Sequence, residues 1–163
     1  LVRSGRIGKI KEVLVSVWGT SKPCALPEEP TPAGMDWERW IGPAPWRPFN
    51  KALHPFNWRN YRDYSGGMMT DWGAHHLDIA QWGLGMDHSG PIEISPPDGK
   101  GPEFVTYRYE SGVTVKCGNV NVNGVQFVGD AGKITVNLPW LSAQPRRRDR
   151  RPPAGHSRMV GHP

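Results

Sequence analysis

The sequence has only two cysteines and no long apolar run. Cys24 and Cys117 form no Cys-x-x-Cys pair, and two cysteines neither require nor exclude a disulfide, so the redox compartment stays open. No apolar stretch has the length of a transmembrane helix or the pattern of a signal peptide, and we expect no contact with a membrane. The cytoplasm is the default compartment. Export of a longer parent is not excluded, because the sequence does not begin with methionine.

Motifs for nucleotide binding and for a serine nucleophile are missing as well. The sequence has no Walker motif and no Gly-x-Gly-x-x-Gly, since Gly83-Leu84-Gly85 closes a predicted helix where a dinucleotide fingerprint would follow a strand. It has no Gly-x-Ser-x-Gly elbow, and Ser111 falls in a predicted hairpin turn with no histidine close in sequence. The sequence alone therefore shows no site for a nucleotide and no support for a serine nucleophile.

The excess of positive charge is confined to the C-terminal end. The formal net charge is +5, from 20 basic and 15 acidic residues, but residues 1–145 carry 14 of each. Residues 142–163 are rich in arginine and proline and have little to bury, so we predict a disordered tail. No aromatic platform accompanies these arginines, and we do not expect binding to nucleic acid. The abrupt change of character after Leu141 also suggests a truncated or frame-shifted C-terminus.

The other residues, 1–141, predict one α+β domain. A β-branched run predicts a strand over residues 9–18, and four prolines exclude regular structure from residues 19–35. Residues 36–41 predict a short capped helix, and residues 43–65 a long aromatic loop of the kind that serves binding. A long helix is predicted over residues 68–84, and further strands over residues 92–94, 103–109, 113–117, 120–128 and 133–137. These elements predict an open, mostly antiparallel β-sheet with the long helix packed on one face.

The predicted long helix carries the one segment that looks built for chemistry. On a helix that turns about 100° per residue, Asp71, His75 and Asp78 fall within about 60° of one another, and Trp82 extends the same stripe. Imidazole titrates near neutrality, and a neighbouring carboxylate can orient it and raise its proton affinity. The stripe is therefore typical of a general acid/base pair.

Two other interpretations of this stripe stay open on spacing alone. It can be the solvated face of an amphipathic helix. It can also be part of a metal site, because ligands one turn apart on a helix hold zinc. No cysteine or second histidine cluster with ligand spacing completes a metal shell, so we predict no metal.

The predicted aromatic loop contains a second candidate site. Trp58 lies between Asn57 and Arg59, which combines a flat apolar ring with hydrogen-bond donors. Such a set can stack on a sugar ring and bind its hydroxyl groups. Packing of the tryptophan within the loop is the alternative.

Four segments together resemble the C-terminal domain of the Gfo/Idh/MocA oxidoreductases, relatives of glucose–fructose oxidoreductase and inositol dehydrogenase. The likeness extends over about residues 2–140. The segments are Gly5-Arg6-Ile7-Gly8-Lys9-Ile10 before a strand, Asp36-Trp37 to Pro45-Trp46, Gly66-Gly67 to Asp78, and the turn Gly129-Asp130-Ala131-Gly132. The helix motif carries most of the resemblance.

The resemblance implies the substrate-binding half of an NAD- or NADP-dependent sugar or polyol oxidoreductase. A Rossmann domain would precede it and hold the cofactor, and the sheet would often form a homo-oligomer interface. In such enzymes an aspartate and a histidine four residues apart work with a Glu-Lys-Pro lysine, and the matching positions are Asp71 and His75. His75 would take the hydroxyl proton, Asp71 would orient it and contact a neighbouring hydroxyl, and Asp78 would support the site or bind substrate.

The sequence departs from the family in one main respect, because the Rossmann domain and its lysine are missing. Ser21-Lys22-Pro23 imitates the Glu-Lys-Pro triplet, but it follows the first strand, so Lys22 is not expected to inherit that role. We expect this polypeptide to be inactive by itself. Two alternatives stay open: a non-catalytic carbohydrate-binding or oligomerisation module, and an NAD-dependent glycosidase of the same superfamily.

Overall fold

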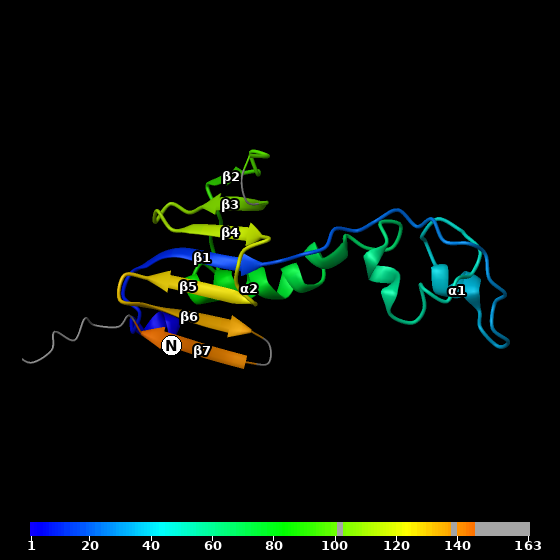
Figure 1. The fold of residues 1–163 in the computed structure, drawn as a ribbon, viewed down its shortest axis with the longest axis horizontal. Coiled ribbons are helices and arrows are strands. Elements are labelled where there is room, and N and C mark those ends of the chain that lie inside the picture. Colours follow the sequence, from blue (N-terminus) through cyan, green and yellow to red (C-terminus); the bar gives the residue numbers. More distant parts are fainter. Residues whose placement is uncertain (101–102, 138–139, 146–163) are drawn as a thin grey trace, which may run out of the picture.

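A seven-stranded open sheet with one long helix against one face forms the body of the protein (Figure 1). The computed structural model describes residues 1–100, 103–137 and 140–145. The strands are β1 (Ile10–Ser16), β2 (Glu93–Ser95), β3 (Phe104–Arg108), β4 (Thr114–Gly118), β5 (Val125–Gly129), β6 (Gly132–Asn137) and β7 (Trp140–Pro145). The helices are α1 (Trp37–Ile41) and α2 (Trp72–Leu84), with 3-10 turns η1 (Val2–Ser4), η2 (Asn57–Asn60) and η3 (Gly67–Met69).

The strand order is β2-β3-β4-β1-β5-β6-β7, with β1 at the centre. β1 runs parallel to β4, and every other neighbouring pair is antiparallel. The predicted hairpins β3–β4 and β5–β6 are both present, so the prediction of an open, mostly antiparallel α+β fold is confirmed. The parallel pair was not predicted, because β1 and β4 are joined only through the whole intervening chain.

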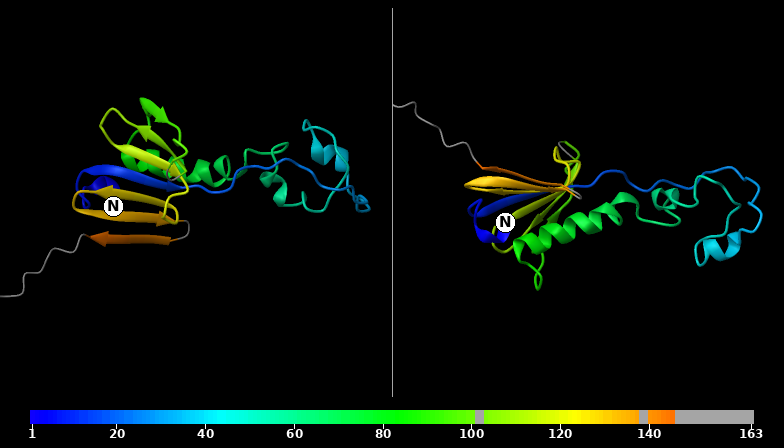
Figure 2. Two further views of the ribbon diagram at one scale, coloured as in Figure 1. Left: turned by 45° about the horizontal axis from the view of Figure 1, so that its top comes forward. Right: turned by 90° about the horizontal axis from the view of Figure 1, so that it is seen from below.

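The core lies between α2 and the face of the sheet that α2 covers, as both views of Figure 2 show. Val13 and Val15 of β1 are fully buried there, next to Val115 and Phe127 of the neighbouring strands. Alternate residues of a strand point to one face, which explains why Val13 and Val15 share the core face while Leu14 between them does not. α2 contributes small residues and one histidine to this contact: Gly73, His76 and Ala80.

An arm, residues 19–66, leaves the end of β1, projects away from the sheet and returns to α2 (Figure 1). The predicted short helix is confirmed as α1. Asp36 caps its N-terminus, because the backbone N–H of Arg39 donates to the Asp36 side chain at 3.0 Å. The aromatic loop has more structure than predicted, because it buries a second small core. The buried members are Trp37, Ile41, Phe49, Leu53 and Tyr61. Prolines prevent regular structure here, but stacked rings such as Trp37 on Trp40 still exclude water.

Three predicted boundaries need correction. α2 begins at Trp72 rather than residue 68, because the glycine-rich segment before it forms the tight turn η3. β5 begins at Val125, since the segment from residue 120 is taken up by turns. β7 was not predicted as a strand, and its pairing with β6 extends the sheet to Pro145, four residues past the predicted domain end at Leu141 and into the predicted disordered tail. The predicted tail from residue 146 onwards lies outside the described residues.

Two further features concern the cysteines and the length of the helices. Both cysteines are free thiols in the structure. Within the described part of the chain, no helix has the length and apolar character needed to cross a membrane.

Candidate active site at the start of the long helix

The N-terminus of α2 is placed by a close contact between Gly67 and the arm. Gly67 has φ of +73°, and a Cβ there would lie 2.6 Å from the backbone nitrogen of Ser21. Only glycine allows this backbone conformation together with so close an approach. The chain then turns through η3, and Asp71 becomes the N-cap of α2, with non-helical φ −95° and ψ −94°.

Because α2 begins at Trp72, Asp71 is separated from His75 and Asp78 of the predicted stripe. His75 and Asp78 lie in α2 and are both exposed, on the side away from His76 and Ala80, which face the sheet. Asp71 precedes the helix, so its side chain does not follow the helical spacing that the prediction assumed. The ring of His75 meets the ring of Trp72 edge to face, with centroids 6.0 Å apart. The exposed imidazole is thus available to a molecule that approaches the outer side of α2.

Asp71 has an arm residue as its charged neighbour. Arg59 Nε lies 3.1 Å from Asp71 Oδ2, within ion-pair distance. The direction of this contact does not meet hydrogen-bond geometry, and Oδ2 is a buried atom without a hydrogen-bond partner among the described residues. We therefore treat the contact as a charge pair rather than as an aligned hydrogen bond. No hydrogen bond between Asp71 and His75 is present in the described part of the chain.

His76 is a buried polar residue that the sequence reasoning did not single out. Its Nδ1 donates to the carbonyl oxygen of Ser16 at 2.7 Å, which ties α2 to the end of β1. Its Nε2 is buried and has no partner in the described residues. Helical spacing carried the signal, because His76 shares the buried side of α2 with Gly73 and Ala80, whereas His75 does not.

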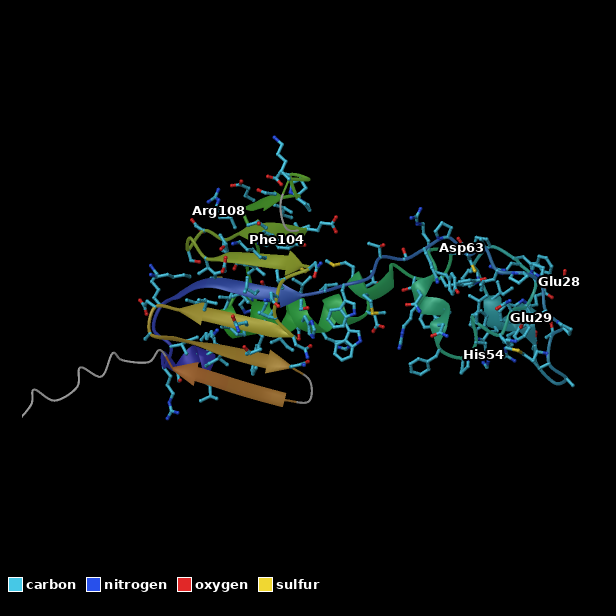
Figure 3. All side chains as sticks on the ribbon, viewed as in Figure 1. Glu28, Glu29, His54, Asp63, Phe104 and Arg108 are labelled. Carbon is cyan, nitrogen blue, oxygen red and sulfur yellow. The ribbon has the colours of Figure 1, made fainter. Side chains whose placement is uncertain are left out.

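The three residues of the second candidate site, Asn57, Trp58 and Arg59, do not share one surface. Trp58 lines a hollow of about 660 Å³ on the arm, together with Trp40, Tyr64, Asp63 and the prolines at positions 43 and 45. Asn57 and Arg59 do not line it. Figure 3 shows Asp63 on the arm, far from the labelled sheet residues Phe104 and Arg108.

A second hollow, of about 710 Å³, lies where the arm meets the sheet. The arm contributes residues 19–21, Arg62 and Gly66, and the sheet contributes Tyr107 and Cys117. Trp18 and Met69, which flank the arm, also line the hollow. Burial raises the pKa of the Cys117 thiol to about 11, so this thiol is uncharged at neutral pH. The hollow reaches Met69 of η3, the turn before α2, but neither Asp71 nor His75 lines it.

Two groups on the arm have a raised pKa. Burial raises the pKa of the Cys24 thiol, although the guanidinium of Arg47 opposes this change. The same burial raises the pKa of Tyr64 nearby. The described residues contain no cluster of three or more histidine, cysteine or acidic side chains that could hold a metal ion.

The chain matches one known protein family by sequence. Residues 15–142 match the oxidoreductase family C-terminal alpha/beta domain of the Gfo/Idh/MocA group. None of the curated proteins matches the chain.

One solved structure has a similar arrangement of elements. It is the WlbA dehydrogenase from Bordetella pertussis in complex with NADH and UDP-GlcNAcA, with 15% sequence identity and a TM-score of 0.47. The superposition covers 90% of this chain and 42% of that one. The chain therefore spans less than half the length of that dehydrogenase.

Proposed function

The chain belongs to the Gfo/Idh/MocA oxidoreductase family through this C-terminal domain, and on that premise we propose a specific role. It is the substrate-binding and catalytic half of an NAD- or NADP-dependent enzyme that oxidises a secondary hydroxyl of a sugar or polyol. The observation that carries the proposal is the exposed His75 on the outer side of α2, one turn after Asp71 at the helix N-cap.

His75 is the general base in this proposal. A bound nicotinamide would supply the hydride acceptor, and it would be held by a separate dinucleotide-binding domain, since this sequence has no dinucleotide fingerprint. His75 takes the proton of the substrate hydroxyl while the hydride leaves the same carbon. Because the imidazole is exposed, both the substrate and another domain can reach it.

The remaining predicted site residues surround this base. Asp71 contacts a neighbouring substrate hydroxyl and limits where the sugar can lie, and exposed Asp78 supports the same outer side of α2. Nε of Arg59 faces Asp71 in the ion pair, and the other N–H donors of the guanidinium can bind the substrate. Asn57 and Trp58 are on the same 3-10 turn as Arg59 and would contact the more distant part of the sugar.

The test joins the chain to a dinucleotide-binding domain and compares two histidine variants. His75→Ala should lower kcat about 10²- to 10⁴-fold, the usual contribution of a general base. His88→Ala is the matched control, because His88 is exposed beyond the end of α2, and its kcat should stay unchanged. Equal turnover in the wild-type protein and His75→Ala would refute the assignment. Release of free sugar without net NADH would instead identify the glycosidase alternative.

The hollow on the arm favours a second candidate function, a non-catalytic carbohydrate-binding module. Its walls combine the rings of Trp40, Trp58 and Tyr64 with the carboxylate of Asp63, and 38% of Trp58 is exposed. Aromatic faces with one polar group suit the apolar face and the hydroxyl groups of a sugar. Tryptophan fluorescence should then change with added saccharide in the wild type and in His75→Ala, but not in Trp58→Ala. Trp46→Ala, which removes an exposed ring outside these walls, is the control.

The uncovered face of the sheet supports a homo-oligomer as the partner arrangement in either case. Among the described elements, α2 covers one face and nothing covers the other, which carries Leu14 and the Glu12–Lys116 ion pair (Figure 2). A second copy of the sheet would bury this face. Sedimentation should show a dimer or larger species that Leu14→Lys weakens, and a monomeric wild-type chain would contradict this arrangement.

A further inference from the structure

Arg59 is held between an aromatic ring and the N-cap carboxylate of α2. On one side its guanidinium carbon lies 4.4 Å from the ring centroid of Phe56, which is a cation–π contact. On the other side its Nε lies 3.1 Å from Asp71 Oδ2. The side chains of Arg59 and Asp71 are only 31% and 24% exposed. Partial burial makes this pair less screened by solvent than an ordinary surface pair.

The backbone that carries Arg59 is fixed at the base of the arm. Lys22 and Tyr61 form a β-bridge, and two backbone hydrogen bonds close it, from Lys22 to Asn60 at 2.9 Å and from Arg62 to Lys22 at 2.8 Å. Arg59 stands two residues before Tyr61 of this bridge. A displacement of the arm therefore moves the guanidinium relative to Asp71.

The carboxylate depends on this arm residue for its countercharge. In the described part of the chain, Asp71 has no other ion-pair partner within 4.0 Å, and its buried Oδ2 has no hydrogen-bond donor. A partly buried carboxylate loses stabilisation when its one charged neighbour is removed, so the guanidinium favours the present position of the carboxylate. The pair engages Oδ2 and leaves the other oxygen, Oδ1, for a substrate hydroxyl.

We propose that Arg59 is a positioning residue, through which the docked arm sets the place of the Asp71 carboxylate beside His75. This inference rests on the proposed function for the meaning of Asp71 and His75. The structural coupling of Arg59 to Asp71 stands without it. Arm docking and assembly of the reacting site are then a single event.

The first part of the test measures the coupling in the full chain and needs no activity. Arg59→Ala and Asp71→Asn should each raise amide hydrogen exchange of residues 60–62 about two- to fivefold, the range for loss of a partly exposed ion pair. The double variant should exchange no faster than the faster single variant. Arg108→Ala is the matched control, because it removes the exposed ion pair between Arg108 of β3 and Glu93 of β2. Arg108 is remote from the arm (Figure 3), so its loss should leave the exchange of these amides unchanged. Additive effects in the double variant would overturn the proposal.

The second part separates positioning from a merely structural role, using the chain joined to a dinucleotide-binding domain. Arg59→Ala should lower kcat about 10- to 100-fold, the cost of misplacing a group in the reacting site. Arg59→Lys, which retains the charge, should recover part of the loss of kcat. In the Asp71→Asn protein, Arg59→Ala should lower kcat no further, and loss of its direct contact with the substrate should raise only KM. An active enzyme whose kcat is unchanged by Arg59→Ala would overturn the proposal. An inactive wild-type enzyme would count against the proposed function, while the exchange data would still decide the coupling.

Discussion

Two glycines in α2 offer a matched test of how closely this helix packs on the sheet. Gly83 lies over the fully buried ring of Phe127: a Cβ at position 83 would stand 2.6 Å from Phe127 Cε1 and closer still to Cζ. At Gly73, near the other end of the helix, a Cβ would meet Met69 Sδ at 3.3 Å and the Met68 carbonyl oxygen at 3.4 Å. The same change, glycine to alanine, therefore meets a rigid neighbour at one position and a movable side chain at the other.

The two substitutions should change stability in opposite directions. In a helix alanine is favoured over glycine by up to about 1 kcal/mol. At position 83 the clash with Phe127 adds an overpacking cost of about 1–3 kcal/mol, because the ring has no space to move into. We expect Gly83→Ala to destabilise the protein by about 1–2 kcal/mol. Gly73→Ala should be neutral or stabilising by about 0.5 kcal/mol, since exposed Met69 can rotate away.

Urea unfolding, followed by circular dichroism and by tryptophan fluorescence, measures both effects. The midpoint should fall for Gly83→Ala at an unchanged slope, which indicates a change of stability rather than of the unfolded state. Phe127→Leu should weaken the penalty of Gly83→Ala in a double-mutant cycle, because it removes the atoms that clash. A Gly83→Ala protein as stable as Gly73→Ala would refute the close contact between α2 and β5.

Two further predictions concern the two cores. The pKa of Cys117 is raised to about 11 from an ordinary 9.0, so the unfolded chain loses the thiol proton at a lower pH than the folded chain does. The free energy of unfolding should therefore fall by about 1 kcal/mol per pH unit between about pH 9 and pH 11. Unfolding of Cys117→Ala at several pH values should lack that part of the slope, and an unchanged slope would contradict it. Leu53→Ala, in the fully buried arm core, should cost about 2–5 kcal/mol locally. Limited proteolysis should then cut the arm faster, and equal loosening of the sheet would show that the arm is not a separate core.

Local patterns in the sequence were enough to predict most of the elements. Alternating apolar residues predict strands, and turn residues such as Gly112 predict where a hairpin reverses, because both depend on neighbours in sequence. Asp36 predicts the start of α1 for the same reason. The family resemblance also came from short motifs, and the match over residues 15–142 confirms it. The roles of His75 and Asp71 stay predictions that the proposed experiments test.

Contacts between distant residues were decided by the tertiary structure alone. Helical spacing placed Asp71 on the stripe with His75, whereas the folded chain makes it the N-cap and pairs it with Arg59 from the arm. The parallel pairing of β1 with β4 and the hydrogen bond of His76 to Ser16 likewise join segments far apart in sequence. The sequence by itself determined most of the elements and the chemical groups on the outer side of α2. Only the folded chain decided which charge faces which, because burial and long-range pairing bring those groups together.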